Sequence, residues 1–260
     1  MMILYEEGKW KLDDPVSKYV PEFASLRVFK GVNADGSFDT VPADRPPTMR
    51  ELMSHSGGFA YGLNPDNPID KAYVDTGVPG RNRARSSFRK SPLCRWWRSR
   101  GRVGSTASRS ISRGLIIEKL TGMSLGDFMQ KRIFAPLKMT DTGFWLPPAK
   151  IDRLASLYAW SPKEKKLVPA EGFMVLDISK PPVVASGGGG LVSTNADYAA
   201  SSDVLNGGEL EGKRILKPET VELMRTNMLS DAIMNSSEPP FNAARGRGFG
   251  LDFAVVMDSA

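Results

Sequence analysis

Apolar residues at helical spacing, bounded by capping and stop residues, predict several helices. The clearest begins after Ser124, where apolar positions recur near helical spacing until Pro136. Thr48 and Glu51 have the spacing of a capping box, which predicts a helix through Leu52. Further helices are expected at residues 1–7 with Gly8 as cap, at 115–121 with Gly122 as stop, after a cap at Thr194 or Asn195, and from Pro218 through Met224.

Strand patterns are shorter and fewer. Residues 153–169 predict two strands around the polar turn Ser161–Lys165, and Gly248–Val256 alternates like a single strand. The glycine run Gly187–Gly190 lacks the Gly-Lys-Ser/Thr ending of a phosphate-binding loop, so we expect it to allow close backbone approach in a sheet. Helices and strands in this order predict an α+β fold.

Residues 81–113 differ from the rest of the chain. They show no aliphatic periodicity and contain eleven Arg and Lys, eight Ser and no acidic residue. The remaining residues carry 24 Lys and Arg against 29 Asp and Glu, a net charge of −5. The overall charge of +6 therefore belongs to this one basic segment, and we expect no nucleic-acid partner for the protein as a whole.

Three interpretations of the basic segment 81–113 stay open. We favour translation in a shifted reading frame: the codons of Trp96 and Trp97 then give Val, and those of Ser105–Ala107 allow Tyr-Ser. The second interpretation is a solvated, disordered insert, because the segment cannot bury much apolar surface. The third is an arm whose basic residues bind phosphates while Trp96 and Trp97 stack on bases.

The composition excludes several classes of protein. The 260 residues suit one domain, residues 1–260, and no apolar run reaches the roughly 18 residues that a membrane span needs. Cys94 is the single cysteine and His55 the single histidine, so no disulfide, metal site or other cofactor is expected, and we expect His55 to be structural. Met1–Tyr5 is followed at once by Glu6 and Glu7, unlike a signal peptide, which predicts a cytoplasmic location.

Five collinear strings outside the basic segment carry a resemblance to a known family. They are LYEEGKWKLDDPVSKYVPEF (4–23), TMRELMSHSGGFAYG (48–62), GLIIEKLTGMSLGDFMQKRIFAPLKMTDTGFW (114–145), ASGGGGLVSTNADYA (185–199) and GFGLDF (248–253). Together they resemble the serine β-lactamase-like and penicillin-binding family, in particular its family VIII carboxylesterase-like branch. The resemblance implies a β-lactamase/transpeptidase-like fold, an antiparallel sheet flanked by helices with a helical subdomain.

The same resemblance implies acyl transfer as the chemistry. In the family a serine in S-x-x-K attacks a carbonyl, the lysine helps to remove its proton, and a tyrosine relays protons. A K-T-G-like or W-G-G-like strand lines the third wall of the site. The small-molecule substrate implied for an intact relative is an ester or a β-lactam, while the oligomeric state stays open.

The sequence departs from the family at each of these motifs. The S-x-x-K belongs before MMILYEEGK, the tyrosine belongs shortly before LIIEKLTG, and the third wall belongs after GFGLDF. None is present there, so we interpret the chain as a fragment, truncated at both ends and inactive as written. We assign no catalytic, cofactor-binding or metal-binding residue. The alternative is a non-catalytic binding protein on the same fold that uses the basic segment.

Several residues imitate catalytic motifs. Ser87 and Lys90 match S-x-x-K, but they lie in the basic segment, after the helix that they should precede. Asp75 and Asp141 each begin an Asp-Thr-Gly triplet like that of aspartic proteases, yet the surrounding sequence lacks the required strands. Ser193–Asn195 resembles an S-x-N motif, but its place before a helix predicts a cap. Cys94 has no histidine near it in sequence, which makes it a poor nucleophile.

Overall fold

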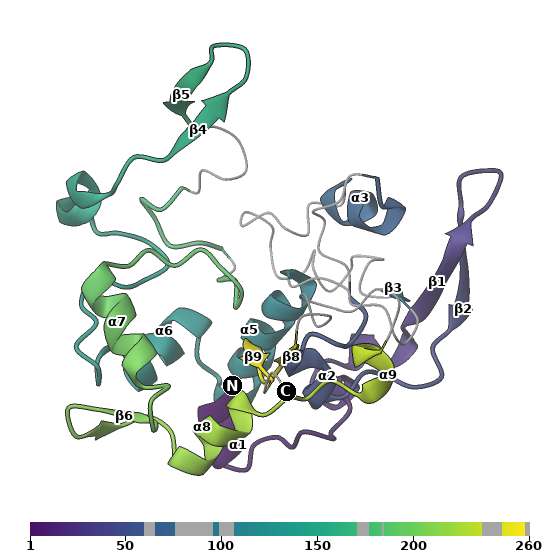
Figure 1. Ribbon diagram of the computed structural model, residues 1–260, viewed down its shortest axis with the longest axis horizontal. Helices are drawn as coiled ribbons and strands as arrows, with labels where there is room; N and C mark the ends of the chain where they lie inside the picture. Colours follow the sequence, from purple (N-terminus) through teal and green to yellow (C-terminus); the bar gives the residue numbers. More distant parts are fainter. Residues whose placement is uncertain are drawn as a thin grey trace.

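The computed structural model describes residues 1–59, 66–75, 96–98, 107–170, 177–183, 185–235 and 246–257. Helices gather into a body that holds both ends of the chain, and two hairpins project from it (Figure 1). The described helices are α1 (Met2–Glu6), α2 (Met49–Met53), α3 (Pro68–Asp75), α5 (Ala107–Thr121), α6 (Leu125–Met129), α7 (Asn195–Asp203), α8 (Pro218–Arg225) and α9 (Asp231–Met234), with a π-helical turn η4 (Gln130–Phe134) and the 3₁₀ turns η1 (Val16–Lys18), η2 (Pro21–Ser25) and η5 (Pro148–Arg153).

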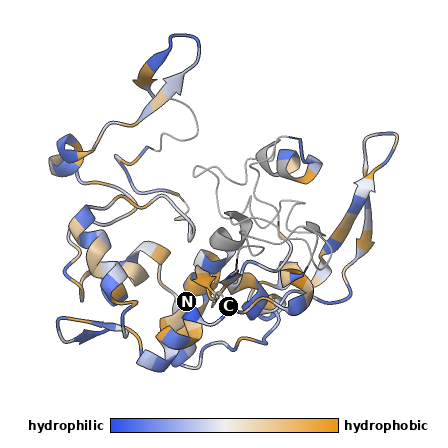
Figure 2. Ribbon diagram, in the orientation of Figure 1, coloured by the Kyte–Doolittle hydropathy of each residue, from blue (hydrophilic) through white to orange (hydrophobic). Residues whose placement is uncertain are grey.

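The hydrophobic core lies where α1, α2, α5 and α6 meet, and apolar residues concentrate there (Figure 2). Trp10 is 1% exposed, its ring packs against Tyr5 at 5.2 Å, and its indole N–H donates to the Met1 carbonyl. Leu52 of α2 and Ile116 of α5 are fully buried in the same cluster. Burial of each such side chain contributes about 1.5–3 kcal/mol, so this cluster holds the short helices together.

The capping residues predicted from sequence begin the helices as expected. The Thr48 side chain accepts from the Glu51 amide while the Glu51 carboxylate accepts from the Thr48 amide, so the capping box of α2 is confirmed. Ser124 caps α6, and Thr194 rather than Asn195 caps α7. Each cap satisfies an amide that the helix itself leaves without a partner.

The described strands form small sheets. A three-stranded sheet has the order β2–β1–β3, in which β1 (Arg27–Val32) pairs antiparallel with β2 (Phe38–Pro42) and parallel with β3 (Trp96–Arg98). The remaining pairs are antiparallel hairpins: β4 (Tyr158–Ser161) with β5 (Lys166–Pro169), β6 (Glu209–Leu210) with β7 (Lys213–Arg214), and β8 (Arg247–Phe249) with β9 (Ala254–Val256). The two strands predicted within 153–169 are thus confirmed, and the fold is α+β.

Three local predictions need correction. The single strand expected at Gly248–Val256 is a hairpin, because the chain turns between β8 and β9, with Asp252 at a φ of 87°. The run Gly187–Gly190 lies in a turn instead of a sheet, and Gly190 uses the positive φ that glycine permits. Helix α5 begins at Ala107 instead of Leu115, since its first residues carry no aliphatic pattern that sequence analysis could detect.

Candidate functional site

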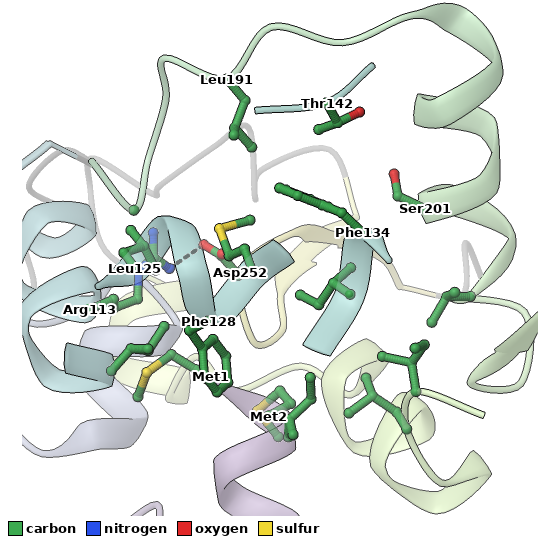
Figure 3. Close-up of a pocket in the computed structure, with 18 of the residues that line it drawn as sticks. Met1, Met2, Arg113, Leu125, Phe128, Phe134, Thr142, Leu191, Ser201 and Asp252 are labelled. Atoms are coloured by element: carbon green, nitrogen blue, oxygen red, sulfur yellow. Dashed lines mark hydrogen bonds and ion pairs between the residues drawn. The ribbon is translucent and has the colours of Figure 1, made fainter. Parts of the chain in front are cut away.

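A cavity of about 590 Å³ opens in the body, between the first residues of the chain, α5, α6, η4 and α7. Figure 3 shows Met1, Phe128 and Phe134 among the side chains around it, with Leu191 at the top of the view and Ser201 at the right. Most of the lining is apolar, and methionines and aliphatic residues predominate. A cavity of this size and polarity suits a small molecule with an apolar part.

The polar end of the cavity is formed by Arg113 of α5 and Asp252 of the β8–β9 turn. The Arg113 guanidinium donates to the Asp252 carboxylate, as the dashed line in Figure 3 marks. The same carboxylate oxygen lies 3.0 Å from Nε2 of His55. Arg113 and His55 are buried, whereas Asp252 is partly exposed, so the carboxylate joins two buried groups from distant parts of the sequence.

The electrostatics of this cluster favour the ionised carboxylate. Burial raises the pKa of Asp252, but the hydrogen bond from His55 and the positive charge of Arg113 lower it by more, so the pKa lies below its ordinary value. The cluster thus holds one anionic group and one fixed cation at the cavity wall.

His55 joins two elements that are distant in sequence, and its structural role stays a prediction. Its ring packs against Phe249 with centroids 4.8 Å apart, and its backbone adopts a φ of 57° directly after α2. The ring therefore links the end of α2 to the strand β8. The sequence did not single out Arg113 or Asp252, because their pairing depends on a contact across 139 positions.

A second polar network holds the opposite wall of the cavity. Asp197 of α7 accepts hydrogen bonds from the Asp141 amide and the Thr142 hydroxyl, each at 2.8 Å, and Thr142 also lies 2.8 Å from the Ser193 hydroxyl. The Asp141 carboxylate instead pairs with Lys150 and Arg153 outside the cavity. The helix cap expected at Ser193–Asn195 is confirmed at Thr194, whereas the absence of a catalytic role for this triplet and for Asp141–Gly143 stays a prediction.

Two serines line the cavity, and both are engaged in structural hydrogen bonds. Ser193 contacts Thr142, and the Ser201 hydroxyl donates to the Tyr198 carbonyl at 2.8 Å. No lysine is found among the described residues that line the cavity. An unactivated serine is a weak nucleophile, and the lining as described holds no serine–lysine pair.

Other residues singled out from the sequence lie outside the described part of the chain. These are Ser87, Lys90 and Cys94; for Asp75, Trp96 and Trp97 only the backbone is described. The interpretation of residues 81–113 as a shifted reading frame stays a prediction. Within the described residues, no helix is long and apolar enough to cross a membrane, and no group of three or more His, Cys, Asp or Glu side chains could hold a metal ion.

Comparison with known proteins identifies the class to which this fold and cavity belong. The family model described as Beta-lactamase matches residues 1–256, and the chain belongs to this family. It is 34% identical over 265 residues to Protein Rv1367c of Mycobacterium tuberculosis, a match that covers 100% of this chain and 63% of that protein. It is 31% identical over 269 residues to a lovastatin esterase of Penicillium rubens, a match that covers 97% of this chain and 61% of that protein.

Solved structures show the same fold. Unliganded simvastatin synthase from Aspergillus terreus superimposes with a TM-score of 0.75 at 23% identity, covering 98% of this chain and 65% of that one. EstCE1, a hydrolase with promiscuous acyltransferase activity, superimposes with a TM-score of 0.70 at 23% identity, covering 99% of this chain and 65% of that one. The resemblance to the serine β-lactamase-like family is confirmed, and the chain spans less than two thirds of the length of these relatives.

Proposed function

We propose that the protein to which these residues belong transfers acyl groups from small esters through a serine-bound intermediate, and that the cavity accepts the apolar acyl chain. The observation that carries this proposal is the apolar cavity of about 590 Å³ with the Arg113–Asp252 pair at its polar end. In such chemistry a serine oxygen attacks the ester carbonyl and the alcohol leaves. Water or an acceptor alcohol then takes the acyl group.

The relatives support an ester as the substrate. One is named an esterase, and one solved structure is described as a hydrolase with promiscuous acyltransferase activity. β-Lactam amides are the second substrate class, since the family model carries that name. The apolar lining favours esters, because a β-lactam presents polar amide and carboxylate groups that would lose their hydration without compensating partners.

Binding of a non-reacting ligand tests the cavity without requiring catalysis. Saturation-transfer NMR with hexanoate as the probe reports contact between the acyl chain and the protein. Ser201→Phe would fill the cavity, whereas Ser202→Phe would place the same ring on the exposed side of α7. Both serines donate to the same Tyr198 carbonyl, so the two variants lose the same hydrogen bond.

We expect Ser201→Phe to weaken hexanoate binding about tenfold or more, a loss of about 1.4 kcal/mol, and Ser202→Phe to bind as the unmodified chain does. Equal binding by both variants would show that the ligand sits elsewhere. The melting temperatures of the two variants serve as the check that both remain folded.

We further propose that the 260-residue chain by itself does not turn over esters. S-x-x-K occurs once in the sequence, at Ser87–Lys90 in the basic segment, and loss of a nucleophile–base unit lowers rates by about 10⁴- to 10⁶-fold. The test is hydrolysis of p-nitrophenyl butyrate and of a chromogenic cephalosporin, with labelling by a fluorophosphonate probe. Turnover and labelling that disappear in Ser87→Ala would contradict this proposal and assign the nucleophile at once.

A further inference from the structure

The β4–β5 hairpin carries an apolar face that nothing in the described structure covers. The hairpin stands away from the helical body at the end of a long connection (Figure 1). Its strands pair Tyr158 with Pro169 and Trp160 with Leu167. Because side chains two positions apart share a face of a strand, these four apolar residues lie on one side of the hairpin.

This face is exposed to an unusual degree. Tyr158 is 55% exposed, Trp160 62% and Leu167 63%. The segment that leads into the hairpin adds exposed aliphatic side chains, Leu154 and Leu157. Contiguous apolar surface rimmed by polar residues marks an interaction site far more often than scattered apolar residues do.

The tip of the hairpin is basic. Its turn contains Lys163 and Lys165, and β5 begins at Lys166. The single acid of the turn, Glu164, pairs with Lys166 at 2.8 Å. The turn is built by hydrogen bonds from the Lys165 amide to the Ser161 carbonyl and from the Glu164 amide to the Ser161 hydroxyl. Lys163 and Lys165 form no salt bridge with the described residues, and both are exposed in the turn that joins the two strands.

We propose that the β4–β5 hairpin docks on an anionic lipid surface, with Trp160 and Leu167 inserted among the headgroups and Lys163 and Lys165 facing acidic phosphates. Trp and Tyr combine an apolar ring with a polar tip and concentrate at the interface between membrane and water. Each lysine near an anionic leaflet adds attraction. Charge complementarity therefore favours an acidic lipid surface over a neutral one.

The shape of the hairpin argues against a small molecule or a second copy of the chain as the partner of this apolar face. A small molecule is bound in a concave site, whereas this hairpin stands away from the helical body and its apolar side chains are exposed. A second copy of the chain would need about 800 Å² on each partner for a stable interface, more than one four-residue face supplies. A lipid surface needs neither a complementary pocket nor a large area, because it adapts to an inserted side chain.

Co-sedimentation with lipid vesicles tests the proposal. The unmodified 260-residue chain is mixed with phosphatidylcholine vesicles that contain phosphatidylserine, with vesicles of phosphatidylcholine alone, and with buffer alone. The apolar variant is Trp160→Ser with Leu167→Ser. Its matched control is Val32→Ser with Val256→Ser, which removes exposed apolar side chains from two other hairpins. The charge variant, Lys163→Glu with Lys165→Glu, is matched by Lys9→Glu with Lys11→Glu.

We expect the apolar variant to bind acidic vesicles at least about tenfold more weakly, because each inserted side chain contributes more than the 1.4 kcal/mol of a tenfold change. The charge variant loses binding to acidic vesicles only, and both controls bind as the unmodified chain does. Binding that survives both hairpin variants would assign the contact to another region, the basic segment 81–113 included, and would overturn the proposal. A dimer that Trp160→Ser converts to monomer, without vesicle binding in either form, would overturn it in favour of a second copy.

Discussion

The cavity and the outer face of the β4–β5 hairpin are both apolar surfaces of the same chain, but the cavity is concave and the hairpin face projects outward. The cavity is enclosed by side chains that belong to the hydrophobic core, such as Leu125 and Phe128. The hairpin face has no such neighbours among the described residues. The concave cavity is the surface that we propose for a small acyl chain. The projecting hairpin is the surface that we propose for a lipid membrane, which adapts to inserted side chains.

Buried and exposed apolar residues also occupy different parts of the sequence. Buried hydrophobic residues occur up to Leu146 and resume at Val204, and between these positions none of the described hydrophobic side chains is buried. Helix caps and turns nevertheless form in both regions. Local sequence signals therefore determine where elements begin and end, whereas burial depends on whether distant segments supply a matching apolar face.

The largest expected difference separates two tryptophans. Trp10→Ala removes a fully buried ring and should lower the free energy of unfolding by about 3–5 kcal/mol. Trp160→Ala changes an exposed ring and should alter it by less than about 0.5 kcal/mol. Urea titrations of the two variants measure both values. Similar losses would mean that the hairpin is packed in solution, which would abolish the contrast.

A smaller effect is expected at the polar end of the cavity. Asp252→Asn keeps the size of the side chain but removes the charge that faces buried Arg113, so we expect a loss of about 2 kcal/mol. The matched change in the exposed region, Asp177→Asn, disrupts a surface pair with Lys180 and should have a much smaller effect. Thermal unfolding of both variants provides the comparison, and equal shifts would contradict the buried pairing.

Helix caps should behave alike in the two regions. Thr48→Ala removes the capping box of α2 in the core, and Thr194→Ala removes the cap of α7 at the edge of the exposed region. Each should lower the free energy of unfolding by about 1 kcal/mol, because a cap acts on its own helix. Thr48→Ser and Thr194→Ser retain the hydroxyl and serve as controls. A cap effect confined to one region would show that caps depend on tertiary packing.

The smallest expected effects concern acid stability. Arg153 and Lys150 lower the pKa of Asp141 to about 2, below the value of about 3.9 in an unfolded chain. Its contribution to stability is therefore complete above about pH 4 and is lost as the pH falls toward 2. The pKa of Asp252 is also lowered in the folded chain, so its contribution to stability is likewise lost as the pH falls.

The stability contributions of Asp141 and Asp252 should differ in their dependence on salt. Ions screen the pairs of Asp141 because its partners Lys150 and Arg153 are accessible to solvent, so Asp141→Asn should matter at low salt and little at high salt. Asp252→Asn should remain destabilising at both, because its partner Arg113 is buried. Unfolding curves recorded across this pH range at two salt concentrations measure both effects. An Asp141 effect that persists at high salt would contradict the screening of its pairs with Lys150 and Arg153.

Much of the fold could be predicted from the sequence because its signals are local. Thr48, Ser124 and Pro218 begin helices for reasons contained within a few residues, and the strands around Ser161–Lys165 follow from alternation and a polar turn. The single strand predicted at Gly248–Val256 was wrong, because the turn at Asp252 depends on its contacts with distant residues.

The candidate site was harder to predict. Its cavity is formed by segments that are far apart in sequence, from Met1 to Asp252, and no short motif marks such an assembly. Arg113 lies at the end of the basic segment, where composition alone suggests a solvated residue, yet it is buried against Asp252. The resemblance to a family implies acyl transfer, whereas the position that we propose for the acyl chain follows only from the three-dimensional arrangement.

Hydroxyl-radical footprinting, read residue by residue by mass spectrometry, tests the central contrast most directly. We expect Trp160 and Tyr158 to be oxidised rapidly in the free chain while Trp10 is protected, and we expect acidic vesicles to protect Trp160 without changing the rate at Trp10. Equal oxidation of Trp10 and Trp160 in the free chain, or no protection of Trp160 by vesicles, would contradict this expectation.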